Sequence, residues 1–169
     1  MKNDTSNTLR HSTPNNVPWP PLLLLATILA GWLAGRYLPV IGQFAMIDRF
    51  PLEPIQIWLG WLIIAVALAL DVWALAIFRQ HRTNIRPDRP AEYLVTHGPF
   101  AVSRNPIYVG NATIILGLAL INGSIWYLLL LPVLIYLINE LAIKREEQHL
   151  MLRFEQQWIV YCSAVRRWL

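Results

Sequence analysis

Four long apolar runs constrain the fold of this 169-residue chain more than any other feature. They cover residues 20–38, 55–78, 107–121 and 125–143. A helix of about 19 residues is about 28 Å long, close to the roughly 30 Å hydrocarbon core of a bilayer, so the first, second and fourth runs can each cross a membrane. The third run would reach only about 22 Å as a helix. To cross the membrane it must extend into its flanking residues, tilt little or pack inside the bundle. The chain is therefore predicted to be an all-α integral membrane bundle of four transmembrane helices.

Most positive charges lie on one side of these runs. Arginines and lysines precede the first run and follow the second and fourth, whereas only Arg36 and Arg49 fall at the opposite ends. The positive-inside rule then places both termini of this multi-pass protein in the cytoplasm. The net charge of +4 arises from segments beside the membrane, so no nucleic-acid partner is expected.

Composition divides the chain into three parts. Residues 1–17 are rich in Asn, Ser and Thr and are predicted to be a disordered tail. We prefer this to the n-region of a signal peptide, because the following run is as long as a true span. Residues 18–84 hold the first two spans, and residues 85–169 hold a loop, a helical hairpin and a cytoplasmic C-terminal amphipathic helix. The single cysteine, Cys162, excludes a CxxC metal site, and no metal is expected.

The third and fourth runs are predicted to form a hairpin. Between them, Asn122-Gly123-Ser124 is too short for anything but a tight turn, so the two helices must be antiparallel neighbours. Their open ends, at 104–108 and 140–147, therefore meet although they are far apart in sequence. Gly110 and Gly117 share one face of the third helix, where small residues favour close packing.

The open end of the hairpin carries a candidate anion site. Pro106 suits the first position of a helix, and Asn105 is a good N-cap. The N–H groups of that first turn, with Arg104 beside them, could hold a carboxylate of a cofactor or substrate. Binding of a lipid phosphate is an alternative that the pattern leaves open.

Acidic residues share the apolar face of the C-terminal helix. A helical wheel at 100° per residue puts Glu146 at the edge of one stripe and points His149 away from it. The stripe comprises Glu140, Ile143, Glu147, Leu150, Met151, Phe154 and Trp158. Such acids need a cationic partner, which could be Arg104 or a neighbouring arginine in a structural clamp, or a cationic ligand. Asp71, inside the second run, is expected to face the interior.

Residues 85–168 resemble the isoprenylcysteine carboxyl methyltransferase family of integral membrane enzymes, which are related to phospholipid methyltransferases. Residues 98–108 follow its G-P-[FY]-x-x-x-R-x-P-x-Y pattern, and Glu146-Glu147 begin its E-E-x-x-L helix. The R-N-P-x-Y form is similar to the short bacterial branch, which implies a bacterial inner membrane. The family ending is matched by Phe154, Tyr161, Val165 and Arg166, although glycine usually follows the phenylalanine and Glu155 stands there.

This resemblance implies S-adenosylmethionine as cofactor and a lipophilic acceptor in the membrane, either a lipid or a lipidated molecule. Arg104 would stand next to the reacting groups, and Glu146 and Glu147 are the further catalytic candidates. The residues expected to bind the cofactor are Tyr93, Leu94, Val95, His97, Gly98, Phe100, Asn105, Pro106, Ile107, Tyr108 and Glu146. A carboxylate acceptor needs no general base, whereas an amine or hydroxyl acceptor would need Glu146, Glu147 or His97.

Three functions remain open at this point. O-methylation of a carboxylate is the first candidate, N-methylation of a phospholipid amine is the second, and a non-catalytic bundle that binds lipid or a partner protein is the third. Eukaryotic members hold the substrate carboxylate with an arginine upstream of the glutamates, and Ala142 at that position argues against a prenylcysteine substrate. A structural clamp predicts that Glu146→Ala destabilises the fold, whereas an enzyme would lose cofactor affinity with its fold intact.

Overall fold

The computed structural model describes residues 19–38, 53–80 and 93–169. Within these ranges every regular element is helical, which confirms the all-α prediction. Two elements are short: η1 is a 3-10 helix and η2 is a π-helix. The elements in chain order are α2 (Trp19–Tyr37), α4 (Glu53–Gln80), η1 (Gly98–Ala101), α5 (Pro106–Asn122), α6 (Ile125–Ile138), η2 (Asn139–Ile143) and α7 (Lys144–Ala164).

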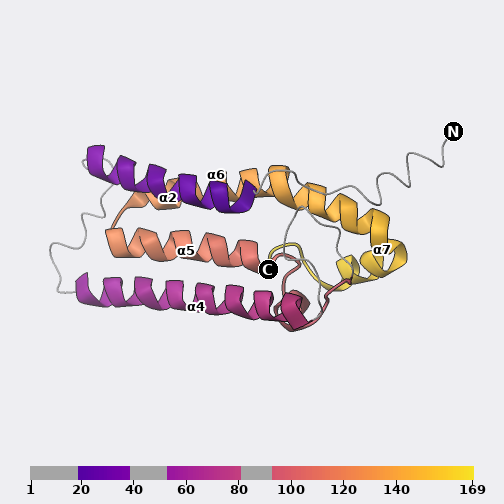
Figure 1. Cartoon of the computed structure of the whole chain (residues 1–169). Helices are drawn as coiled ribbons and strands as arrows, with labels where there is room; N and C mark the ends of the chain where they lie inside the picture. The colour runs from indigo at the N-terminus through magenta and orange to yellow at the C-terminus, as the bar shows by residue number, and fades with distance from the viewer. Residues whose placement is uncertain (1–18, 39–52, 81–92) are drawn as a thin grey trace.

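Helix α5 occupies the middle of the bundle. It packs against α4 on one side and against α6 on the other, and α6 in turn packs against α2 (Figure 1). Ile115 of α5 and Leu134 and Ile138 of α6 have almost no exposed surface and form the centre of the core. Many large apolar side chains of α2 and α4 are instead exposed, as expected for a surface that faces lipid.

Three helices are long and apolar enough to cross a membrane, namely Trp19–Tyr37, Pro54–Gln80 and the continuous helix Ile125–Ala164. Helix α5 has 17 residues, about 25 Å, and lies between α4 and α6. That placement agrees with the expectation that the short third run packs inside the bundle. The number of four spans and the cytoplasmic termini stay predictions, and the predicted tail 1–17 lies outside the described residues.

The hairpin turn between α5 and α6 is confirmed. Gly123 ends α5 in the left-handed conformation, with φ 55 and ψ 31, which glycine adopts without steric cost. Its N–H donates to the carbonyl oxygen of Leu120, and the N–H of Ser124 donates to that of Ala119. The chain therefore reverses within three residues, and α5 and α6 run antiparallel.

The predicted packing role of the α5 glycines is also confirmed. A Cβ atom added to Gly117 would lie 2.8 Å from the carbonyl oxygen of Gly60 in α4, and the reverse distance is also 2.8 Å. The two backbones thus approach each other too closely for any side chain at the crossing. Gly110, on the same face, lies against Asp71 of α4. Asp71 accordingly faces a neighbouring helix, as expected.

The C-terminal helix departs from the regular geometry that the helical wheel assumes. Helix α6 continues through η2 into α7, which bends sharply at Glu155 (Figure 1). Two assignments on the wheel are wrong: His149 is buried, whereas Met151 is exposed. A π-helix has more residues per turn than an α-helix, so the 100° spacing loses register across η2.

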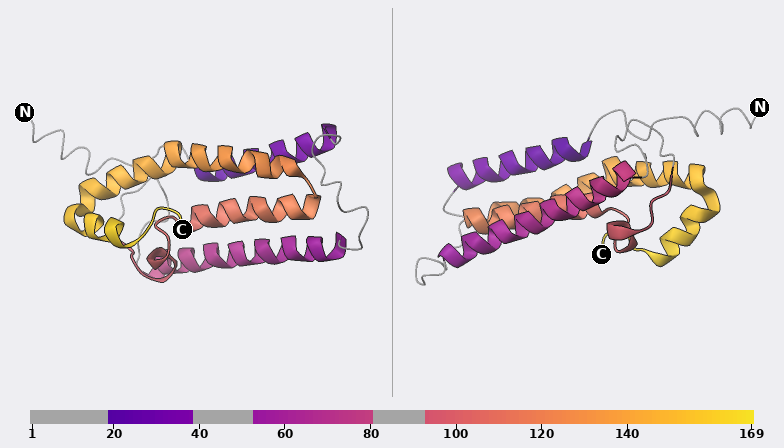
Figure 2. Two further views of the ribbon diagram at one scale, coloured as in Figure 1. Left: turned by 180° about the vertical axis from the view of Figure 1, so that it is seen from behind. Right: turned by 60° about the horizontal axis from the view of Figure 1, so that its bottom comes forward.

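The bend in α7 brings the end of the chain back to the bundle. Both views in Figure 2 show the C-terminus beside the segment that leads into α5. The backbone N–H of Arg104 donates to the carbonyl oxygen of Arg166 at 2.9 Å. Three segments therefore meet at one end of the bundle: the loop before α5, the start of α7 and the C-terminal residues.

Candidate functional site

The loop before α5 is fixed by hydrogen bonds to the C-terminal residues. Helix α5 begins at Pro106 with Asn105 as its N-cap residue, as predicted. The Asn105 side chain does not cap the helix, because its Nδ2 donates to the carbonyl oxygen of Arg167 at 2.9 Å. Ser103 Oγ donates to the same carbonyl at 3.3 Å. The start of α5 is thus anchored to residues that follow it by about 60 positions in the chain.

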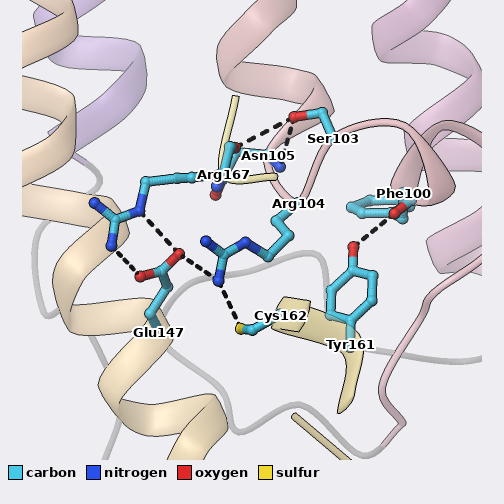
Figure 3. Close-up of polar contacts among 8 residues, drawn as sticks. All are labelled: Phe100, Ser103, Arg104, Asn105, Glu147, Tyr161, Cys162 and Arg167. Carbon is cyan, nitrogen blue, oxygen red and sulfur yellow. Dashed lines mark hydrogen bonds and ion pairs between the residues drawn. The ribbon is translucent and has the colours of Figure 1, made fainter. Parts of the chain in front are cut away.

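Glu147 lies between two guanidinium groups (Figure 3). Arg167 donates through Nε to Oε1 at 3.0 Å and through Nη2 to Oε2 at 2.6 Å. Arg104 Nη1 lies 3.3 Å from Oε1 of the same carboxylate. The hydrogen bonds to Glu147 raise the pKa of the Arg167 guanidinium above its ordinary value. Two positive charges share one negative charge, so this group of three residues carries a net charge of +1.

Arg104 has further contacts and a buried Nε donor. Its Nη1 also donates to Sγ of Cys162, and its guanidinium carbon lies 5.7 Å from the centre of the Trp158 ring, within range of a cation–π interaction. Its Nε is buried and has no hydrogen-bond partner among the residues that the structure describes. Buried donors are nearly always satisfied in folded proteins, so this N–H suits a ligand oxygen.

The second glutamate has a different environment. The hydroxyl of Tyr108 donates to Oε1 of Glu146 at 2.7 Å and joins α5 to α7. Tyr108 is buried in the same core as Ile115 and Leu134. Glu147 is thus neutralised by arginines, whereas the recorded partner of Glu146 is a neutral hydroxyl. The carboxyl group of Glu146 is therefore available to a cation or a proton.

The remaining predicted cofactor residues line the loop on its α4 side. Val95 and Phe100 are buried in a cluster with Ala74 and Ile77 of α4, and the Phe100 ring lies 4.8 Å from the Phe78 ring. Gly98 adopts φ 62 and lies against Ile77. The other four residues differ in exposure: Tyr93 and His97 are exposed, Leu94 is partly buried and Ile107 packs against this cluster.

The structure therefore groups the candidate residues in two sets. Arg104, Asn105, Tyr108, Glu146 and Glu147 meet where α5 and α7 begin. Val95, Gly98 and Phe100 contact α4 instead. The hydroxyl of Tyr161 ties this part of the loop to α7 by donating to the carbonyl oxygen of Phe100 at 2.7 Å.

Sequence reasoning did not identify Arg167, Trp158 or Cys162 as neighbours of Arg104. Their contacts with the loop and with Glu147 span between 20 and 64 positions, and no helical spacing connects residues on opposite sides of the bend in α7. One signal was available. The family usually has glycine where this chain has Glu155, and a glycine at a fixed position in a helix indicates a bend.

Glu155 provides a test of this bend. Its φ of 44 and ψ of −111 are strained for any residue with a side chain. We expect Glu155→Gly to be more stable than Glu155→Ala by about 1 kcal/mol. At Gln156, which is helical, the order should reverse, since glycine costs about 1 kcal/mol relative to alanine inside a helix. Thermal or denaturant unfolding in detergent would measure both pairs, and the same order at both positions would exclude a bend at Glu155.

The fold and the site define a helical membrane protein with paired acids and arginines at one end of its bundle. Residues 55–157, more than half of the chain, match the family model described as phospholipid methyltransferase. The chain belongs to this family, which is part of the same group of membrane methyltransferases as the isoprenylcysteine carboxyl methyltransferases. The membership implies methyl transfer, with S-adenosylmethionine as the typical donor. No curated protein and no solved structure matches the chain.

Proposed function

We propose that the protein transfers a methyl group from S-adenosylmethionine to a lipophilic acceptor in the membrane, with a carboxylate as the first candidate acceptor. The observation that carries the proposal is Arg104, whose buried Nε lacks a partner within the described part of the chain while its other end is held by Glu147. A donor that is fixed in place before the ligand arrives loses little freedom on binding. The cofactor, when bound, supplies the reactive methyl group.

Arg104 and Glu146 suit the two charges of such a cofactor. Arg104 Nε and the first turn of α5 would hold the carboxylate of its amino-acid part. The carboxylate of Glu146, fixed by Tyr108, would face the positive sulfonium group, which aromatic rings also attract. These two residues would then orient the methyl group, and orientation can contribute up to about 7 to 11 kcal/mol to a reaction of this kind.

The nature of the acceptor depends on how these charges are used. A carboxylate acceptor needs no base, so it requires no proton acceptor in the site. An amine acceptor must lose a proton, and Glu146 is the acid in the site not paired with an arginine. That residue, together with the family match, favours the amine of a phospholipid as the second candidate.

The test is to incubate the purified protein with methyl-labelled S-adenosylmethionine and a membrane extract. We expect label in the lipid fraction that mild alkali releases as volatile methanol, which identifies a methyl ester. Alkali-stable label in lipid would instead establish the phospholipid amine or another acceptor. No label above a Glu146→Ala control, in extracts from several sources, would reject methyl transfer and favour the non-catalytic bundle.

A further inference from the structure

The C-terminal residues after α7 form a strap over the loop before α5. We define this strap as residues 165–169. Its backbone carbonyls accept three hydrogen bonds from consecutive residues of the loop: Arg166 accepts from Arg104, and Arg167 accepts from Ser103 and Asn105. Trp168 packs against the core cluster that includes Tyr108 and Ile143. The strap is therefore held against the loop by its backbone and against the core by the Trp168 side chain.

Arg167 makes the strongest side-chain contact of this strap. A guanidinium that donates two parallel hydrogen bonds fixes both the position and the plane of a carboxylate. Arg167 meets Glu147 in this way, at 3.0 and 2.6 Å, whereas Arg104 reaches only Oε1 of Glu147, at 3.3 Å. Arg167 thus determines where the carboxylate lies, and Arg104 follows the position of that carboxylate.

We propose that Arg167 is a positioning residue, which holds Glu147 so that Arg104 presents its free Nε to the anionic group of the cofactor. Three observations support this role. Glu147 Oε1 is shared by both arginines, and Arg104 Nε is buried without a partner in the described ranges. The strap also binds the backbone N–H of Arg104 and the side chains of the residues on both sides of it. Arg167 need not touch the cofactor itself. This role rests on the proposed function, because it requires a bound anionic group.

The charge balance explains why a second arginine is needed. If Arg104 were the only partner of Glu147, the carboxylate would neutralise the Arg104 guanidinium and would compete with an anionic ligand for it. Arg167 occupies both oxygens of Glu147 and leaves Arg104 with a weaker contact and an uncompensated positive charge. The site therefore keeps a cation available for a ligand although an acid lies beside it.

The test measures equilibrium binding of S-adenosylhomocysteine to the full-length protein in detergent, a readout that does not require turnover. We expect Arg167→Gln to weaken binding about 10-fold, as for loss of one charge-assisted contact. Arg167→Lys keeps the charge but cannot donate two parallel hydrogen bonds, so its affinity should lie between that of Arg167→Gln and that of the wild type. Arg166→Gln is the matched control, because the Arg166 side chain is exposed and only its carbonyl contacts the loop. It should bind like the wild type.

A double variant shows whether Arg167 acts through Glu147. If it does, adding Glu147→Gln to Arg167→Gln should not weaken binding further, since both changes remove the same support and the double variant also lacks the carboxylate that competes for Arg104. Wild-type affinity of Arg167→Gln, or an equal loss in Arg166→Gln, would overturn the inference. So would a folded Arg167→Lys with the same affinity as the wild type. If the wild type itself binds no S-adenosylhomocysteine, the proposed function fails instead.

Discussion

Glu146→Gln is expected to lower the rate of methyl transfer by about 100-fold or more while leaving the fold intact. The substitution keeps the size of the side chain and an oxygen that can accept the hydrogen bond from Tyr108. It removes the negative charge that we assign to the sulfonium group or to a proton of the acceptor. Loss of a positioned acid or base typically costs 10²- to 10⁴-fold in rate.

The measurement pairs single-turnover methyl transfer with thermal unfolding in the same detergent. Glu140→Gln is the matched control, because Glu140 is on the same continuous helix and its ion pair with Lys144, at i and i+4, is partly exposed. Such a pair contributes a few tenths of a kcal/mol, so this variant should keep both activity and stability. A Glu146→Gln protein that unfolds at a much lower temperature yet still binds the cofactor would establish the structural clamp instead.

Local sequence rules predicted the parts of the fold that depend on neighbouring residues. The start of α5 at Pro106 follows from the fixed φ of proline, and the reversal at Gly123 follows from the short polar turn between two apolar runs. The fourth apolar run ends at Ile143, where η2 also ends. These features need no knowledge of the rest of the molecule.

The site was only partly predictable because its contacts cross irregular backbone. The approach of Arg104 to Glu147 follows from the hairpin, which brings the two open ends together, and it was among the expected pairings. The face of α7 was not predictable, since the π-helix η2 changes the register and Glu155 bends the helix. Arg167 reaches Glu147 only because of that bend.

Arg104→Met and Glu147→Met are expected to separate ligand binding from stability. In Arg104→Met the pair between Arg167 and Glu147 remains and is neutral, so the free energy of unfolding should fall only by about 0.5 to 1 kcal/mol, from the lost contact with Trp158. Binding of S-adenosylhomocysteine should fall by about 30-fold or more, because the variant removes the buried donor that we assign to the ligand.

In Glu147→Met the order reverses, because two guanidinium groups are left beside each other without their shared carboxylate. Removing one partner of a buried ion pair costs about 3 to 5 kcal/mol, but the side chain of Arg167 is 35% exposed, so solvent screening reduces the expected loss to about 1 to 3 kcal/mol. Unfolding in detergent and ligand binding, measured on both variants, give four values. If Arg104→Met is as unstable as Glu147→Met and binds the ligand normally, then both residues serve the clamp alone. The charge balance predicts the opposite. Glu147 should stabilise the contact between the loop, α7 and the strap, whereas the positive charge of Arg104 should serve mainly to bind the anionic ligand.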